Sequence, residues 1–335
     1  MARRFWDSNA CLVLRHKISK FRAKFDIVYR IKRLENAYHA LEDNLGYEWG
    51  SPWLAVPDVM TSEATLKVLI NTEKSLARYG DAEFCIVSGG FVTYQDYSPV
   101  LQQKLIQVLR NPINSCLVCV PRAFGDLAMF NHTAREFWRW FMRFHREGLN
   151  KLLSEFKFKN RDSSVARPQL GDAFVSRPYM DYMSKRMSES VFALWKQLFT
   201  GKSLLIVEGR YSRLGVGNDL FDAAVSIRRI WCPPLNAFSK YDEIFQAIRT
   251  LAKKDEMVLI ALGPTATVLA YELAQVGIRA LDVGHLDVEY LWMRMRAAKK
   301  VPIKGRYVNE CNKGWEMVKI AGEEAKLGVV KVIEE

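Results

Sequence analysis

Two acidic side chains, Asp81 and Glu83, lie two positions apart in the first third of the chain. In an extended segment, side chains at positions i and i+2 point to the same side. Carboxylate oxygens placed in this way suit Mg²⁺ or Mn²⁺, and a nucleotide diphosphate commonly supplies further ligands. The pair therefore predicts a divalent-metal site, with a solvated turn as the alternative.

A second acidic cluster lies near residue 285 and contains a histidine. Asp282, His285, Asp287 and Glu289 place four potential metal ligands or bases within eight residues, and no other histidine of the five lies in so acidic a setting. The chemistry of this cluster complements that of the first pair. A solvated turn is again the alternative for the cluster taken alone.

Two glycine-containing loops offer sites for phosphate. Gly263 permits a tight turn into a helix, where free amides and the hydroxyls of Thr265 and Thr267 can bind an anion. The alternative is an ordinary strand-to-helix turn capped by Thr265. The loop 208–219 matches neither a Walker loop nor a GxGxxG fingerprint, which disfavours an NTPase or a dehydrogenase. Its arginines and glycines can still approach phosphate oxygens, and its candidate residues are Arg213, Gly215, Gly217, Asn218 and Asp219.

Predicted strands and helices place these loops at one edge of a sheet. The predicted strands are residues 84–87, 116–120, 203–207, 228–232, 257–261 and 279–282. The predicted helices are residues 62–76, 99–109, 131–156, 219–226, 241–253 and 266–275. Alternating strands and helices predict an α/β fold with a Rossmann-like, mostly parallel sheet covered by helices on both faces. Ligands of such sheets bind at the carboxyl ends of the strands.

Composition indicates a folded protein, because 335 residues with 49% hydrophobic content can bury a core. The six cysteines include a CxxC inside the apolar run 116–120, but no second pair completes a zinc site. We therefore expect reduced core cysteines in a cytosolic protein. No apolar run reaches the roughly 18 residues of a membrane span, and no signal peptide is recognisable.

Much of the net charge of +12 is concentrated at the N-terminus, where residues 1–33 carry ten Lys or Arg against two Asp. Apolar residues recur there every three or four positions, which predicts one face of an amphipathic helix. They are Leu14, Ile18, Phe21, Phe25 and Val28. We predict that residues 1–60 form a basic amphipathic helical extension and linker before a catalytic domain, 61–335. Residues 1–33 would bind an anionic membrane surface or a partner subunit.

Seven blocks of sequence resemble the bacterial glycosyltransferases of the GT-D fold, which carry a DxE motif. The blocks occur in the same order, and the resemblance extends over residues 75–292. They are Arg78–Phe84, Phe174–Tyr179, Ile206–Gly209, Arg213–Phe221, Cys232–Pro233 with Asn236–Phe238, Leu262–Tyr271 and Gly284–Tyr290. Asp81 and Glu83 match the DxE, with Ala82 where glycine is more usual.

The resemblance implies a transferase that uses a UDP-sugar and Mn²⁺ or Mg²⁺ in the assembly of bacterial surface polysaccharides or glycoproteins. We predict transfer of a hexose, glucose first, to a glycan or glycoprotein acceptor. Asp81, Glu83 and His285 are the expected metal ligands, and the metal would neutralise the leaving diphosphate. Arg78, Asp81 and Arg177 would join the loop residues in binding the nucleotide-sugar.

An inverting transfer needs a general base for the acceptor hydroxyl. Asp287, Glu289 and His285 are the candidates, and the sequence does not rank them. We expect the acceptor near the helix 132–146, which is rich in Arg and Trp.

Three other functions are compatible with parts of the sequence. A sugar-nucleotide hydrolase or phosphotransferase would use the same loops and metal. A non-catalytic nucleotide-binding scaffold would dock through the N-terminal helix but has no use for the acidic clusters. The basic composition also allows a nucleic-acid-binding protein, but no zinc-finger, helix-turn-helix or RNA-recognition signature is present, so we expect no nucleic-acid partner. We expect a cytoplasmic protein, peripheral at the inner face of the cell membrane if residues 1–33 bind lipid.

Overall fold

The computed structural model describes residues 27–28, 30–34, 37–38, 41, 58–158, 169–311, 314 and 327–334. Residues 1–50 and 51–335 form two compact units, each described here by itself. In the first unit the described residues are helical, and their side chains, including Ile31 and Leu34, are exposed. The predicted apolar face from Leu14 to Phe25 lies outside the described residues.

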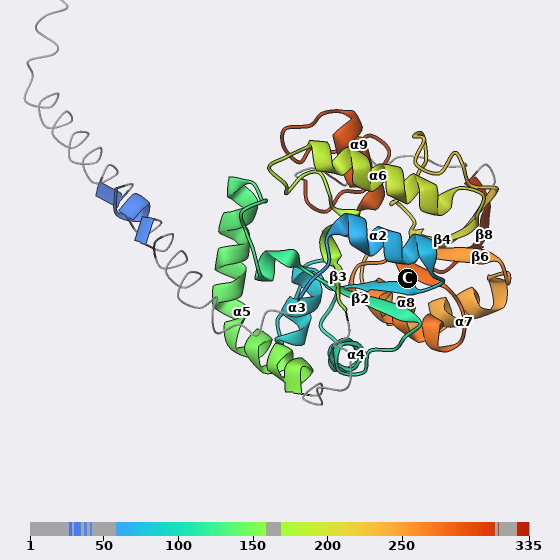
Figure 1. Cartoon of the computed structure of the whole chain (residues 1–335), viewed down its shortest axis with the longest axis horizontal. Coiled ribbons are helices and arrows are strands. Elements are labelled where there is room, and N and C mark those ends of the chain that lie inside the picture. The colour runs from blue at the N-terminus through green and yellow to red at the C-terminus, as the bar shows by residue number, and fades with distance from the viewer. Residues whose placement is uncertain are drawn as a thin grey trace, which may run out of the picture. The chain divides into compact units, whose positions relative to one another are not determined.

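A parallel eight-stranded sheet forms the centre of the second unit (Figure 1). Its strand order is β3-β2-β1-β7-β6-β4-β5-β8, and every neighbouring pair is parallel. The strands are β1 (Ser75–Arg78), β2 (Cys116–Val120), β3 (Gly171–Asp172), β4 (Ser203–Gly209), β5 (Ser226–Cys232), β6 (Glu256–Ala261), β7 (Ala280–Asp282) and β8 (Val329–Val332).

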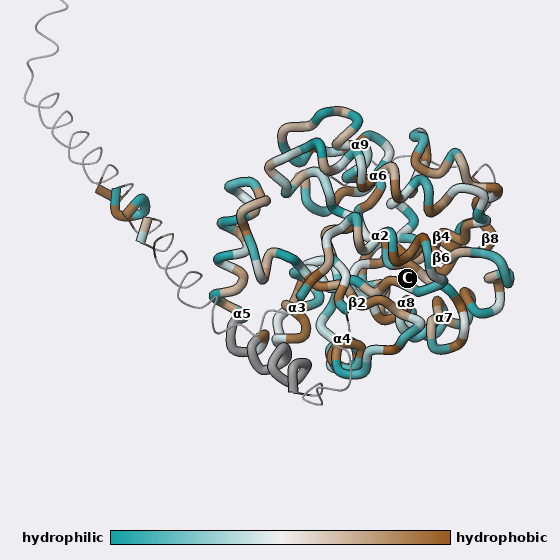
Figure 2. The backbone as a smooth tube through the Cα atoms, in the orientation of Figure 1, coloured by the Kyte–Doolittle hydropathy of each residue, from teal (hydrophilic) through white to brown (hydrophobic). Residues whose placement is uncertain are grey.

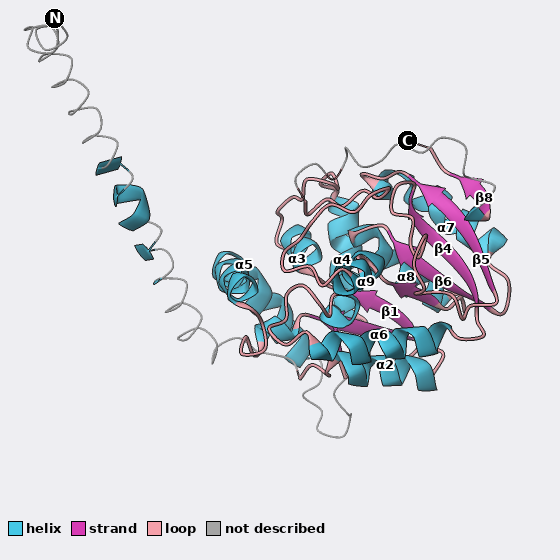
Figure 3. Ribbon diagram, turned by 90° about the horizontal axis from the view of Figure 1, so that it is seen from above, coloured by secondary structure: helices cyan, strands magenta, loops and turns pink. Residues whose placement is uncertain are grey.

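Helices cover both faces of this sheet (Figures 1 and 3). On one face lie α2 (Ser62–Asn71) and α6 (Arg186–Phe199), and on the other lie α4 (Pro99–Arg110), α7 (Tyr241–Leu251) and α8 (Pro264–Gln275). The remaining helices are α3 (Asp81–Val87), α5 (His132–Phe158) and α9 (Leu286–Arg294). None of the helices in the described ranges is long and apolar enough to cross a membrane.

The core lies between these layers, because the central strands consist largely of apolar residues (Figure 2) and are buried along most of their length. Leu204, Ile206, Leu259 and Leu281 are completely buried there. The predicted α/β architecture, with a parallel sheet covered on both faces, is thus confirmed.

Two local predictions around the DxE are wrong. The helix predicted for 62–76 ends at Asn71, and Ser75–Arg78 forms β1 instead. The apolar run 84–87, predicted as a strand, belongs to α3. A run of four apolar residues does not distinguish a strand from a buried helical turn. Glu83 favours the helix over the strand here, because its carboxylate accepts a hydrogen bond from Gly80 N at 2.6 Å and so fixes the start of the helix.

The helix predicted for 219–226 is also wrong. Asn218 Oδ1 accepts a hydrogen bond from Leu220 N at 3.0 Å and stabilises a turn, after which β5 begins at Ser226. The sequence predictions missed α6, α9 and the edge strand β8.

Candidate functional site

A cleft opens at the carboxyl ends of five parallel strands, the position where ligands bind in sheets of this kind. It encloses about 1120 Å³, part of which is open to solvent. Residues that follow β1, β4, β5, β6 and β7 line it, including Asp81, Ser212, Pro233, Gly263 and His285. The cleft therefore lies at the edge of the sheet at which the sequence predicts the site.

A buried ion pair joins the two strands that carry the acidic clusters. Arg78, at the end of β1, donates to Asp282 Oδ1 and to the Asp282 carbonyl, both at 2.8 Å. Thr267 Oγ1 donates to the Arg78 carbonyl at 2.8 Å. Gly284 must lack a side chain, since a Cβ atom there would lie 2.1 Å from Arg78 Nη2. Arg78 lines the cleft, but its hydrogen bonds show a structural role.

The two carboxylates of the DxE lie in different environments. They begin helix α3, so the expectation of an extended segment with both side chains on one side is wrong. Asp81 is exposed, lines the cleft and has no hydrogen-bond partner among the described residues. Glu83 is buried and caps its own helix at Gly80, and burial, together with Asp282, raises its pKa to about 7.

His285 forms a cluster with Glu310 and Arg177 on the cleft wall. Glu310 lies 2.6 Å from His285 Nδ1 and 2.7 Å from Arg177 Nη2, and it also pairs with Lys300. Burial acts to raise the pKa of Glu310, but Arg177 and His285 hold it well below its usual value. An ionised carboxylate only accepts hydrogen bonds, so Nδ1 carries a proton and Nε2 of a neutral imidazole is the acceptor. The 3.2 Å contact from Arg177 Nη1 to Nδ1 is then a close approach and not a hydrogen bond.

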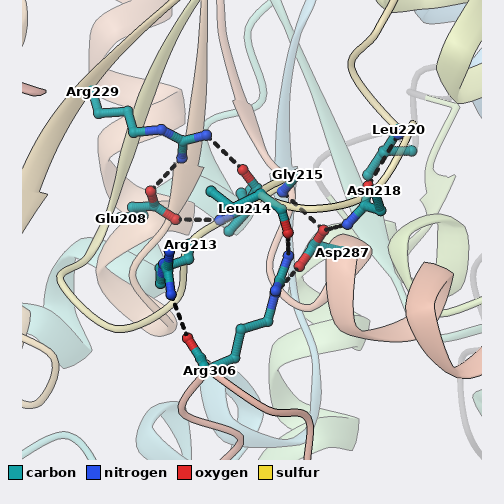
Figure 4. A network of polar contacts seen from close by, with 11 residues as sticks. Glu208, Arg213, Leu214, Gly215, Asn218, Leu220, Arg229, Asp287 and Arg306 are labelled. Carbon is teal, nitrogen blue, oxygen red and sulfur yellow. Dashed lines mark hydrogen bonds and ion pairs between the residues drawn. The ribbon is translucent and has the colours of Figure 1, made fainter. Parts of the chain in front are cut away.

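Asp287 holds the glycine-rich loop in place (Figure 4). Its Oδ1 accepts from Gly215 N at 2.8 Å and from Asn218 Nδ2 at 2.6 Å, and its Oδ2 accepts from Arg306 Nε at 2.5 Å. Asp287 contributes to the cleft wall but is almost completely buried. Its carboxylate is therefore occupied by structural hydrogen bonds.

A second buried carboxylate supports the same loop (Figure 4). Glu208 accepts from Leu214 N at 2.7 Å and pairs with Arg229 at 2.5 Å, and the side chains of this ion pair are 0% and 4% exposed. These contacts place Leu214 on the cleft wall. The predicted phosphate ligands of the loop do not line the cleft, namely Arg213, Gly215, Gly217, Asn218 and Asp219.

Glu289 is completely buried behind the cleft. Its Oε2 accepts from Tyr179 N at 2.9 Å and from Met180 N at 2.8 Å. Burial raises its pKa to about 7, against the opposing effect of Arg177. Glu289 thus fixes the segment after Arg177 and does not reach the cavity.

The helix after Gly263 only partly matches the predicted phosphate site. Gly263 has a φ of 55° and lines the cleft, where a Cβ atom would lie 3.0 Å from the Tyr94 ring. Thr265 and Thr267 are completely buried. Their hydroxyls donate to Gln95 and to the Arg78 carbonyl, so they are not available to a phosphate in this structure.

The sequence predictions missed several residues of the cleft. Tyr94 and Gln95 come from a loop that carries no recognisable motif. Asn236 holds this loop through two hydrogen bonds. Its backbone N–H donates to the Tyr94 carbonyl at 2.8 Å, and its side-chain Oδ1 accepts from Gln95 Nε2 at 2.5 Å. Asn236 adopts a left-handed conformation after two prolines, which is the one local signal of a special turn. Glu310 was missed because it lies after the matching blocks.

The donor set fits a cation that is shared with a ligand. Among the described residues, no three His, Cys, Asp or Glu side chains lie close enough together to hold a metal ion. Asp81 is the available carboxylate, whereas Glu83 caps a helix and His285 Nδ1 contacts Glu310. Mg²⁺ is commonly held by one or two carboxylates together with substrate phosphates. Asp81 fits that arrangement, and a metal centre made by protein ligands alone does not.

Comparison with known proteins gives the class of this fold. The family model for the glycosyltransferase GT-D fold matches residues 76–311. The probable glycosyl transferase Gly of Streptococcus gordonii is 40% identical over 256 residues, which are 76% of this chain and 36% of that protein. Glycosyltransferase GlyD of Streptococcus pneumoniae is 38% identical over 264 residues, or 77% of this chain and 30% of that protein. The chain thus spans about a third of the length of these curated relatives.

Solved structures agree with this result. A domain of unknown function 1792, described as having a distinct glycosyltransferase fold, has a TM-score of 0.75 and 36% identity, with 85% of this chain and 99% of that chain covered. A new glycosyltransferase of the same domain type from Streptococcus sanguinis has a TM-score of 0.74 and 38% identity, covering 83% and 100%. The fold is thus a Rossmann-like α/β fold of the GT-D type. The chain belongs to the GT-D fold family of glycosyltransferases.

Replacing Arg229 with methionine tests the support of the glycine-rich loop. Arg229→Met leaves Glu208 buried without its partner, so we expect the free energy of unfolding to fall by about 3–5 kcal/mol. Urea denaturation measures the change. Arg249→Met, at an exposed position on α7, is the control and should cost no more than about 0.5 kcal/mol. A loss below about 1 kcal/mol for Arg229→Met would contradict the role of this ion pair.

Replacing Glu289 with glutamine tests its raised pKa. Between pH 4.5 and 7 the unfolded chain has lost this proton while the folded chain retains it, so stability falls as the pH rises. Each pH unit in this window costs up to about 1.4 kcal/mol. We expect Glu289→Gln to make the free energy of unfolding less dependent on pH in this window. Glu189→Gln, at an exposed position on α6, should keep the dependence of the unaltered chain, and an unchanged slope in Glu289→Gln would refute the assignment.

Proposed function

We propose that this chain transfers a hexose, with glucose as the first candidate, from a UDP-sugar to a hydroxyl group of a glycan or glycoprotein acceptor. In this proposal a divalent cation assists the reaction, and the products contribute to bacterial surface polysaccharide or glycoprotein. The observation that carries the proposal is the position of Asp81, Arg177 and His285, which line both the cleft described above and a second, adjoining cavity.

The donor would occupy the cleft at the strand ends. Gly263 and the Tyr94–Gln95 loop offer backbone and polar groups there, and Arg177 offers a cation to the diphosphate. Positive charge at this point stabilises the departing nucleotide, which gains negative charge in the transition state. Asp81 would hold a divalent cation together with the diphosphate, and the bound cation would supply Lewis-acid stabilisation of the leaving group.

The acceptor would occupy the second cavity, which encloses about 1490 Å³, part of it open to solvent. Its wall includes Asn131, Thr133, Phe137 and Trp138 from the start of α5 and the residues just before it, the region in which the sequence predicts the acceptor. Aromatic rings beside hydroxyl and amide groups suit a sugar, which has apolar faces and polar edges. Lys299 and Lys300 line the same cavity.

His285 is our choice for the general base among the three candidates. Asp287 and Glu289 are engaged by backbone amides and by Arg306, whereas the His285 ring lies in the wall between donor and acceptor. Glu310 holds Nδ1, which directs Nε2 as the proton acceptor for the attacking hydroxyl. This arrangement supports a direct displacement with inversion. Residues 1–33 remain candidates for binding an anionic membrane or a partner subunit, on the basis of charge.

Release of UDP from a panel of UDP-sugars in the presence of Mn²⁺ tests the donor site. We expect release with one sugar, and a loss of about 10²–10³-fold in Asp81→Ala, because charge stabilisation of the leaving group is removed. Glu83→Ala should also lower release, through the loss of the cap that positions Asp81. Asp255→Ala, at an exposed position just before β6, is the control and should retain full activity.

The same assay separates the rival functions. Release that requires no acceptor and forms no glycoside would favour a hydrolase. If no UDP-sugar binds or is cleaved, the proposed function is wrong.

Transfer kinetics of His285→Ala and Glu289→Gln rank the candidate bases. His285→Ala should lower kcat by about 10²–10⁴-fold, because a positioned general base contributes that amount. Its thermal stability should remain close to that of the unaltered chain. Glu289→Gln should retain most of kcat, since Glu289 does not reach the cavity. A larger loss in Glu289→Gln than in His285→Ala, or no loss in His285→Ala, would contradict the assignment and favour a reaction without a base at this position.

A further inference from the structure

Helix α5 carries apolar residues on two of its faces. Towards the core it buries Ala134, Trp138, Phe141 and Met142, and the Trp138 ring packs edge-on against Phe124. A helix with a single buried face normally presents polar residues on the other side. The outward side of α5 departs from this rule.

Three aromatic side chains form a ridge along the outward side of α5. Phe137, Trp140 and Phe144 are 39%, 44% and 64% exposed, and their spacing of three and four residues places them on one face. Their rings lie next to one another, with centroids 6.0 Å apart for Phe137 and Trp140 and 5.1 Å apart for Trp140 and Phe144. Large exposed rings that gather in this way mark an interaction surface.

The segment of α5 that carries this aromatic ridge has a net positive charge. Between His132 and His145 the helix has three arginines and one glutamate, and the exposed Arg143 places its guanidinium 5.9 Å from the centre of the Phe144 ring. Two copies that met through this ridge would bring their arginines together, so the charge opposes self-association. An anionic surface would attract them.

We propose that the aromatic ridge of α5 docks the protein on the interface of an anionic lipid bilayer. Trp and Phe rings insert at the boundary between headgroups and acyl chains, and the exposed Arg143 beside them lies where lipid phosphates would attract it. Each basic side chain near such a surface contributes about 1 kcal/mol. The helix lies on the bilayer in this arrangement and does not cross it.

Docking would bring the second cavity to the bilayer surface, because Phe137 belongs both to the ridge and to the cavity wall. Helix α5 lies at the edge of the sheet-containing unit, beyond α3 (Figures 1 and 3). The exposed rings and the charge of α5 would favour docking whether or not the chain catalyses the proposed transfer reaction.

Sedimentation with lipid vesicles tests the proposal on the full chain. The probes are vesicles of phosphatidylcholine alone and vesicles of equal parts phosphatidylcholine and phosphatidylglycerol. We expect binding to the anionic vesicles that weakens with salt, and a partition coefficient at least about tenfold lower for the variant Trp140→Ser/Phe144→Ser. The control Val225→Ser/Val330→Ser removes two exposed apolar side chains outside α5 and should bind as the unaltered chain does. Melting temperatures establish that both variants are folded.

A second measurement separates the ridge from the basic N-terminus, which the sequence also predicts to bind membranes. An environment-sensitive fluorophore on Phe144→Cys, in a chain whose other reactive cysteines are serine, should shift to shorter wavelength on anionic vesicles. Bound protein without this shift, or a Trp140→Ser/Phe144→Ser variant that binds normally, overturns the proposal. Absence of vesicle binding in the unaltered chain also overturns the proposal. This includes the outcome in which the unaltered chain binds no vesicles but is a dimer in solution, and Trp140→Ser/Phe144→Ser is a monomer.

Discussion

The buried ion pair between Arg78 and Asp282 connects the two strands on which the rest of the site depends. Strands β1 and β7 are neighbours in the sheet, although about 200 residues separate them in the chain. The pair is almost excluded from water, so removing either partner would leave an uncompensated charge in the core. Because the Gly80–Asp81 turn follows one strand and Gly284–His285 follows the other, this contact fixes the distance between the carboxylate and the imidazole.

Burial assigns different roles to acidic residues that look alike in the sequence. Glu83, Glu208, Asp287 and Glu289 lie within the core and hold backbone amides or arginines, whereas Asp81 alone of the DxE pair faces solvent in the cleft. A carboxylate that accepts several hydrogen bonds in the interior stabilises a loop but is poorly placed to take a proton from a bound acceptor or to coordinate a cation. Glu310 differs from these carboxylates, because its partner is not a core group but His285, whose ring lines the cavity.

The two cavities share a wall, and this feature relates the proposed reaction to the proposed docking surface. Asp81, Arg177 and His285 face both spaces, and Phe137 extends the second one to the exposed ridge of α5. In the proposed arrangement, an acceptor held at a bilayer would reach the His285 imidazole from the second cavity, and the donor would reach it from the first.

The sequence by itself determined the parallel sheet, its helical covering and the edge at which the cleft lies, because apolar strands and amphipathic helices follow short-range periodicity. It also identified Asp81, Arg177, Gly263 and His285, which all line the cleft. It could not separate these from Thr265, Thr267 or the loop 213–219, since the direction of a side chain depends on partners far along the chain, such as Asp287 for Gly215. Only the tertiary structure brought Glu310 to His285 and placed Glu83 in a helix cap. Contacts between residues remote in sequence, and the burial that they create, leave no local pattern from which those roles could be predicted.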